Sequence, residues 1–128
     1  MSKERRPINV GLGDLLQFRW PIIALASISH RIAGVVLFIG LGIMLLALQV
    51  SLDSQAGFDL VQGYIASPLG KLLTWALLAA LAYHFVAGVK HLIFDGSDLE
   101  TLGAATLAAR VTLIISAILM ALAAYWVI

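Results

Sequence analysis

The chain has 128 residues, of which 62% are hydrophobic and 12% are charged, and its mean hydropathy is +1.02. A soluble domain is about half apolar and about a quarter charged, so this composition indicates a membrane protein. The net charge of +1 and the lack of a basic patch argue against a nucleic-acid-binding protein. The sequence has no cysteine, which excludes disulfides and thiolate-held iron–sulfur clusters within the chain. Any such cluster would belong to a partner.

Three runs of the sequence contain no Asp, Glu, Lys or Arg, and each has 18 or 19 residues: Ile32–Val50, Leu72–Val89 and Val111–Ile128. This length is close to the ~20 residues that cross the hydrocarbon core of a bilayer. Helices are expected because three segments cannot close a barrel and every backbone amide must be satisfied internally. We therefore expect an all-α membrane protein with three transmembrane helices in a single anchor domain, residues 1–128.

The predicted helices extend somewhat beyond the apolar runs and cover roughly 22–50, 70–92 and 108–128. The first begins near Ile22 because Pro21 suits the first turn of a helix. The connection 51–71 contains Gly57, Gly63 and Pro68, and we expect a polar loop there with one short surface helix.

The basic residues are divided unequally between the two sides of the predicted bundle. Only Lys71 lies in the connection between the first two helices. The other seven of the eight lie before or within the start of the first helix, or beside the second connection: Lys3, Arg5, Arg6, Arg19, Arg31, Lys90 and Arg110. By the positive-inside rule, this places the N-terminus inside and, after three crossings, the C-terminus outside.

The stretch "AYHFVAGVKHLIFD", residues 82–95, places a histidine among small residues. His84 and Gly88 are four residues apart and share a helix face, close to Ala80 and Ala87. This setting suits haem ligation, because neutral imidazole binds the iron and the macrocycle needs space beside the helix. The alternative is a histidine that hydrogen-bonds across a helix interface beside residues that only allow close packing.

His91 follows His84 by seven residues and lies about 10 Å from it along the helix axis. The two cannot both ligate one haem, since axial ligands approach the iron from opposite faces. A six-coordinate haem would need its other histidine from His30 or from a second polypeptide. His91 is expected near the membrane interface, where it is either solvated or hydrogen-bonded to a haem propionate.

The stretch "SISHRIAG", residues 27–34, places polar side chains at the start of the first helix. Ser27 and Arg31 share a face, and His30 adjoins it. A hydroxyl beside a guanidinium suits a quinone whose carbonyl oxygens gain negative charge on reduction. The same donors suit a haem propionate. The alternative is that Arg31 snorkels to lipid phosphates and Ser27 bonds to its own helix.

These two stretches occur in order after "RPIN", residues 6–9. Together the three motifs resemble the cytochrome b556 membrane-anchor subunits of bacterial succinate dehydrogenase (succinate:quinone oxidoreductase). The resemblance runs from Arg6 to the third helix and includes the three-helix layout. It implies a bundle that binds haem together with a second anchor subunit.

The resemblance also implies roles for particular residues. His84 would be an axial ligand of the iron of a b-type haem, with the opposite ligand from the second anchor subunit. Ser27 and Arg31 would help to form the ubiquinone site. His30 and Arg31, and less directly His91, would contact the haem propionates.

The function implied by the resemblance is membrane anchoring combined with electron transfer to ubiquinone. The partners would be the second anchor subunit, an iron–sulfur subunit, a flavoprotein subunit and the lipid bilayer, with no nucleic acid. The location would be the bacterial inner (cytoplasmic) membrane, and dehydrogenase chemistry would lie outside this chain. The alternatives are a haem-free or differently haemed anchor of a fumarate reductase, or a small transporter or assembly subunit.

Overall fold

The computed structural model describes residues 11, 13, 17, 19–97 and 101–128, so the motif at residues 6–9 lies outside the described residues. Four helices follow one another in these ranges: α2 (Ile22–Asp53), α3 (Gln55–Ala66), α4 (Pro68–Asp95) and α5 (Leu102–Val127). The described part of the chain has no strand. Helices α2, α4 and α5 are long and apolar enough to cross a membrane. The prediction of an all-α membrane protein with three spanning helices is confirmed.

Short polar side chains set the starts of three helices. The side-chain oxygens of Ser54, Ser67 and Thr101 each accept a hydrogen bond from the backbone N–H three residues later, at 3.0, 3.0 and 3.2 Å. These bonds satisfy amides that have no partner within the helix itself. Pro68 occupies the start of α4, where a missing N–H costs nothing.

The helices extend beyond the ranges that the apolar runs suggested. Helix α5 begins at Leu102 rather than near 108, and α4 covers Pro68–Asp95 rather than 70–92. Charged residues such as Lys90 and Arg110 therefore lie on helical turns, outside the most apolar part of each span. The short helix expected between residues 51 and 71 is α3.

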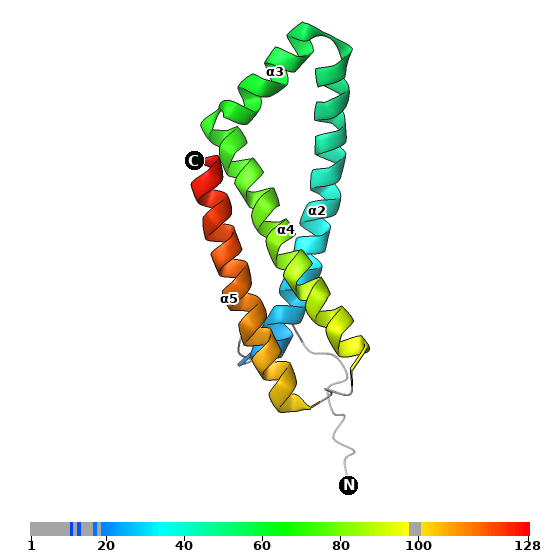
Figure 1. Cartoon of the computed structure of the whole chain (residues 1–128), viewed down its shortest axis with the longest axis vertical. Helices are drawn as coiled ribbons and strands as arrows, with labels where there is room; N and C mark the ends of the chain where they lie inside the picture. Colours follow the sequence, from blue (N-terminus) through cyan, green and yellow to red (C-terminus); the bar gives the residue numbers. More distant parts are fainter. Residues whose placement is uncertain (1–10, 12, 14–16, 18, 98–100) are drawn as a thin grey trace.

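Helices α4 and α5 lie side by side and antiparallel over most of their length (Figure 1). Helix α2 crosses α4 close to the end at which α2 begins and then diverges from it, and α3 bridges the gap at the far end (Figure 1). The residues buried between the helices are mostly small: Ala26, Ala33, Gly40, Tyr83, Ala87, Ala109, Thr112 and Ser116. Small residues let helix backbones approach closely in a membrane, where packing drives association.

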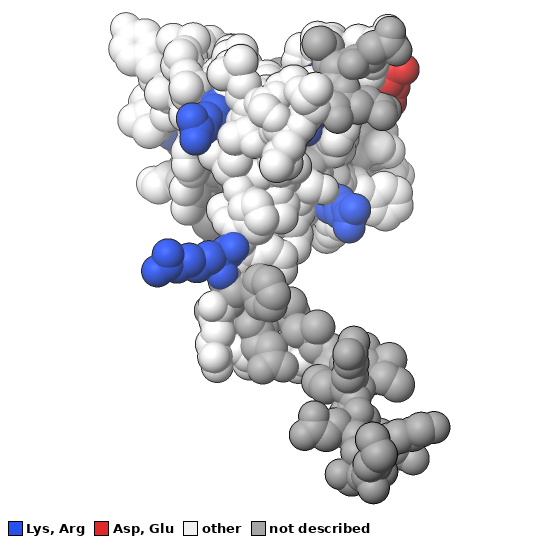
Figure 2. Space-filling model, turned by 90° about the horizontal axis from the view of Figure 1, so that it is seen from below, with Lys and Arg blue, Asp and Glu red and all other residues white. Residues whose placement is uncertain are grey.

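The described cations are separated between the two ends of the molecule. The start of α2, the end of α4 and the start of α5 lie at one end, which carries Arg19, Arg31, Lys90 and Arg110. Figure 2 views this end, and basic side chains dominate it over acidic ones. Lys71 lies at the opposite end, beside Ile128, the residue that follows α5. The fold thus keeps the division of charge that the sequence predicted.

Candidate functional site

All three histidines of the chain meet where α2 crosses α4. His30 comes from α2, and its ring stacks on that of His84 with centroids 4.1 Å apart and an interplanar angle of 22°. The ring of His91, one heptad further along α4, lies 5.4 Å from that of His30 at an angle of 38°. The sequence placed His30 beside Ser27 and Arg31 and left it as a candidate for contact with a haem. The structure adds that His30 lies against α4, close to both other histidines.

The imidazole of His84 is held by the backbone of α2. Its Nδ1 lies 3.1 Å from the carbonyl oxygen of His30. A carbonyl can only accept, so Nδ1 carries the hydrogen, and the lone pair of the neutral ring is on Nε2. Histidines that ligate a metal commonly use one nitrogen in this way, because the second hydrogen bond fixes the tautomer and the ring orientation. The hydrogen bond thus leaves Nε2 as the nitrogen of His84 that could ligate a metal.

Gly34 contributes to the same arrangement. A Cβ atom at this position would lie 3.1 Å from Cε1 and 3.5 Å from Nδ1 of His84. The first distance is tighter than ordinary van der Waals contact, so any side chain at position 34 would press on the imidazole. The ring of His84 thus rests directly against the backbone of α2.

His30 has a buried nitrogen that requires a polar partner. Its Nε2 is inaccessible to solvent and makes no hydrogen bond within the described part of the protein. Gly88 of α4 faces this nitrogen, since a Cβ there would lie 4.0 Å from it. Buried polar side-chain atoms are normally hydrogen-bonded, so within the described residues this nitrogen lacks the partner that such an atom usually has.

The other predicted site residues surround this crossing. Ser27 is half-buried and Arg31 is exposed, one turn apart on α2, and His91 is exposed on α4. The structure thus brings His30, His84 and His91 together, with Ser27 and Arg31 on the adjoining turns of α2. Haem iron needs only one or two protein ligands. A histidine whose ring orientation is fixed and a buried polar nitrogen without a hydrogen bond among the described residues fit that group.

Metal binding without a macrocycle has no comparable support. Among the described residues, no group of three or more His, Cys, Asp or Glu side chains is arranged to hold a metal ion. The three histidines meet through their ring faces rather than with three nitrogens around a common point.

Sequence reasoning missed Tyr83, which directly precedes His84. Its side chain is buried, at 5% exposure, and its hydroxyl donates to the carbonyl oxygen of Ala26 at 2.8 Å. The signal was present in the sequence, because a tyrosine within a span rich in Ala and Leu usually has a partner for its hydroxyl. The identity of that partner depended on the packing of α2 on α4.

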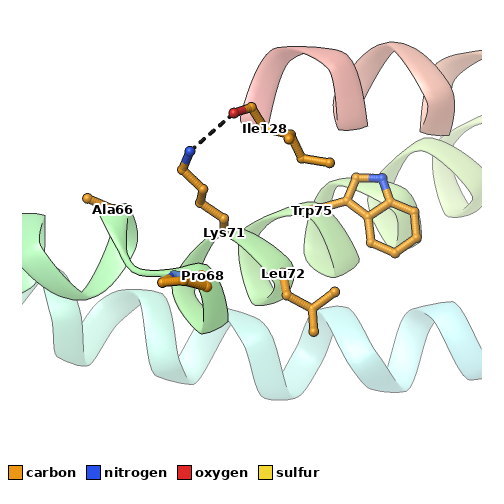
Figure 3. Close-up of a pocket in the computed structure, with 6 residues that line it drawn as sticks. All are labelled: Ala66, Pro68, Lys71, Leu72, Trp75 and Ile128. Carbon is orange, nitrogen blue, oxygen red and sulfur yellow. Dashed lines mark hydrogen bonds between the residues drawn. The ribbon is translucent and has the colours of Figure 1, made fainter.

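A separate hollow lies at the other end of the molecule, where α4 begins and α5 ends (Figure 3). It has a volume of about 360 Å³ and is lined mainly by apolar side chains. Lys71 crosses it to donate from Nζ to the backbone oxygen of Ile128 at 3.2 Å (Figure 3). None of the predicted site residues lines this hollow, so the chemistry that the sequence suggests is concentrated at the α2–α4 crossing.

Comparison with known proteins gives a consistent family assignment. Residues 2–123 match the family described as succinate dehydrogenase/fumarate reductase transmembrane subunit. The chain is similar to the succinate dehydrogenase cytochrome b556 subunit of Coxiella burnetii, with 32% identity over 124 residues that cover 96% of this chain and 97% of that protein. It is also similar to the subunit of the same name from Paracoccus denitrificans, with 31% identity over 101 residues, 78% of this chain and 75% of that protein.

Proposed function

Because this chain belongs to the family of succinate dehydrogenase and fumarate reductase transmembrane subunits, we propose that it is the cytochrome b anchor of a succinate:quinone oxidoreductase. In this role it binds haem b together with a second anchor subunit and contributes to the ubiquinone site. The observation that carries the proposal is the imidazole of His84, held in one tautomer within a helix that can span a membrane. Succinate oxidation itself belongs to other subunits of the complex.

His84 holds the haem iron through Nε2 in this proposal, because its Nδ1 donates to the carbonyl of His30. When bound, the haem takes up and releases one electron at a time. The rings of His30 and His84 stack on each other with centroids 4.1 Å apart, so no haem could lie between these two imidazoles. This arrangement supports a second axial ligand from the second anchor subunit rather than from His30.

The haem propionates are assigned to His30 and Arg31, with His91 in a more peripheral position. The buried Nε2 of His30 needs a polar partner, and a propionate oxygen would supply one. Arg31 is exposed on the next residue of α2, and guanidinium groups bind carboxylates through two parallel hydrogen bonds. His91 is exposed on α4 near His30, so it has room for a water-mediated or direct contact.

Ser27 and Arg31 form this chain's part of the ubiquinone site in the proposal. The hydroxyl of Ser27 donates a hydrogen bond to a quinone carbonyl, and Arg31 stabilises negative charge that develops on quinone oxygen during reduction. Ser27 is half-buried and Arg31 exposed, so the two lie at the border between the helix contact and the surroundings. This border is where a lipid-soluble head group can reach protein donors.

Electrons reach this site from outside the chain. The chain has no cysteine to hold an iron–sulfur cluster, so the clusters would lie in an iron–sulfur subunit, and the proposal assigns the flavin to a flavoprotein subunit. These soluble partners dock at the end that carries Arg19, Arg31, Lys90 and Arg110, which faces the cytoplasm by the positive-inside rule. A reporter that is active only in the periplasm should work when fused after Ile128 and stay silent within residues 96–103. The reverse pattern would contradict this orientation in the inner membrane.

The proposal as a whole is tested by difference spectroscopy on membranes that contain the full complex. We expect a reduced-minus-oxidised signal of a b-type haem, together with succinate-driven reduction of ubiquinone. Both should disappear from membranes in which only this chain is deleted. A complex that reduces quinone without any b-type signal would indicate a haem-free anchor. A chain whose deletion changes neither property would belong to a transporter or assembly subunit, and the proposal would be wrong.

A further inference from the structure

We propose that Tyr83 is a positioning residue for the quinone site, because its hydroxyl holds the turn of α2 that carries Ser27 and Arg31. The inference rests on the proposed function and adds to it a residue that contacts neither the haem iron nor the quinone. Its basis is the hydrogen bond from the hydroxyl of Tyr83 to the carbonyl oxygen of Ala26, 2.8 Å long and buried between α2 and α4.

Two consecutive residues of α4 hold one turn of α2. The hydroxyl of Tyr83 donates to the carbonyl of Ala26, and Nδ1 of His84 donates to the carbonyl of His30. The two carbonyls are four residues apart and therefore about 6 Å apart along the axis of α2. Two bonds at different heights on one helix face fix both its rotation and its translation relative to α4. We call this pair of bonds the α4 clamp.

The α4 clamp determines where Ser27 and Arg31 point. Each of these residues directly follows a residue whose carbonyl is held, Ala26 and His30 respectively. Successive side chains of an α-helix are about 100° apart around its axis, so both project from the same side of the clamped face. Rotation of α2 would swing both side chains together and would separate them from a bound quinone.

Packing alone would hold the turn of α2 that carries Ser27 and Arg31 less firmly than packing together with the α4 clamp. The buried neighbours of Tyr83 in the core are Ala33 and Ala87, whose small side chains offer little resistance to a small rotation of one helix on another. A hydrogen bond is directional, and it is stronger in an apolar interior than in water. The hydroxyl of Tyr83 therefore supplies orientation, whereas its ring supplies contact area.

The test replaces the hydroxyl and keeps the ring, in the assembled four-subunit complex. Tyr83→Phe should raise the KM for a short-chain ubiquinone by about 3- to 10-fold, the range expected for one interhelical hydrogen bond in a membrane. The kcat should fall as well, because Arg31 stabilises charge that develops during the reduction. The haem should stay low-spin, because His84 and its bond to α2 remain. Succinate oxidation with an acceptor that takes electrons from the soluble subunits should also be unchanged.

Trp75→Phe is the matched control. The Nε1 of Trp75 donates to the carbonyl of Met120 at 3.1 Å, so this variant also removes one bond from an aromatic side chain of α4 to a helix carbonyl. That bond joins α4 to α5 and leaves the turn at Ala26 in place. The KM for ubiquinone should therefore stay at the wild-type value.

The positioning role is contradicted if the two variants shift the KM equally, if neither shifts it, or if only Tyr83→Phe fails to assemble. The last result would show that the hydroxyl supports the fold rather than the site. If the wild-type complex reduced no ubiquinone, the proposed function would be contradicted as well as the role of Tyr83. If the wild-type complex were active and Tyr83→Phe had the same KM, only the positioning role of Tyr83 would be contradicted.

Discussion

The contact of helix α4 with α5 differs in character from its contact with α2. Along its contact with α5, the bond from Trp75 to Met120 joins the two helices, and the buried residues of α5 are the small Ala109, Thr112 and Ser116. Against α2, helix α4 places two hydrogen bonds to backbone carbonyls and three imidazoles at one crossing. The first contact is that of a packed membrane bundle. The second concentrates polar groups where each one is expensive to bury, which is typical of a functional site.

Two buried polar atoms lack a hydrogen bond in the described part of the protein, namely Oγ of Ser116 on α5 and Nε2 of His30 at the α2–α4 crossing. The two atoms differ in what can satisfy them. A serine hydroxyl rotates about one bond and can donate to a carbonyl of the preceding turn of its own helix. The rigid ring of His30 projects Nε2 away from its own backbone and has no such local acceptor. Among the described residues, Nε2 of His30 is therefore the one of these two atoms that its own helix cannot satisfy.

The largest effect is expected from adding one methyl group to α2 beside His84. Gly34→Ala would place a Cβ atom 3.1 Å from Cε1 of His84, so the imidazole must shift. Changes in the support of a metal ligand commonly cost 10- to 100-fold in affinity or activity. We expect a loss of bound haem of this order or a changed b-type spectrum, measured on the purified complex.

Gly42→Ala is the control for that experiment. Gly42 lies on the same helix, and a Cβ there would have no atom within 4 Å. Alanine is favoured over glycine within helices by about 1 kcal/mol in peptides, so neither variant should weaken α2 itself. If Gly34→Ala retained haem as well as Gly42→Ala does, the close contact between α2 and His84 would have no role in haem binding.

A smaller effect is expected from the side chains that face the quinone. Removing one partner of a hydrogen bond to a charged group costs about 1.5–3 kcal/mol, which corresponds to about tenfold or more in a rate or an affinity. Arg31→Leu should lower quinone reductase activity by that order, and Ser27→Ala by a similar or smaller factor. Arg31→Lys should restore activity only partly, because an ammonium lacks the planar guanidinium.

Arg110→Leu separates a site effect from a general loss of charge. Arg110 is also exposed, and it lies on α5 at the same end of the molecule. Its loss should leave quinone reduction unchanged, while oxidation of succinate with a soluble acceptor should persist in all these variants. Normal quinone reduction in assembled Arg31→Leu and Ser27→Ala complexes would mean that Arg31 only snorkels to lipid phosphates.

The membrane spans could be predicted from the sequence because hydropathy depends on composition along one segment. The ends of the helices were harder to predict from the sequence. Residues 102–107 extend α5 beyond the charge at Arg110, and a search for charge-free runs stops at that residue. The hydroxyl of Thr101, which caps the first turn of α5, is the local signal that marks the true start.

The sequence suggested which residues belong to the candidate site, but it did not indicate how their side chains are arranged. Spacing along one helix placed Ser27 with Arg31 and separated His84 from His91. It could not show that His30 stacks on His84 or that Tyr83 bonds to Ala26, because these contacts depend on how α2 and α4 are aligned. That alignment is set by close packing of small residues such as Ala26, Ala33 and Ala87. Other small residues lie nearby in the sequence, so the sequence alone does not indicate which of them form the contact.

The central claim is that His84 ligates a haem at the α2–α4 crossing, and the reduced-minus-oxidised spectrum of matched histidine variants tests it most directly. His84→Leu removes the imidazole whose Nδ1 is bonded to α2, whereas His91→Leu removes an exposed imidazole one heptad along the same helix. We expect loss or strong perturbation of the b-type signal in His84→Leu and a six-coordinate, low-spin haem in His91→Leu. A normal low-spin spectrum in an assembled His84→Leu complex would contradict the account.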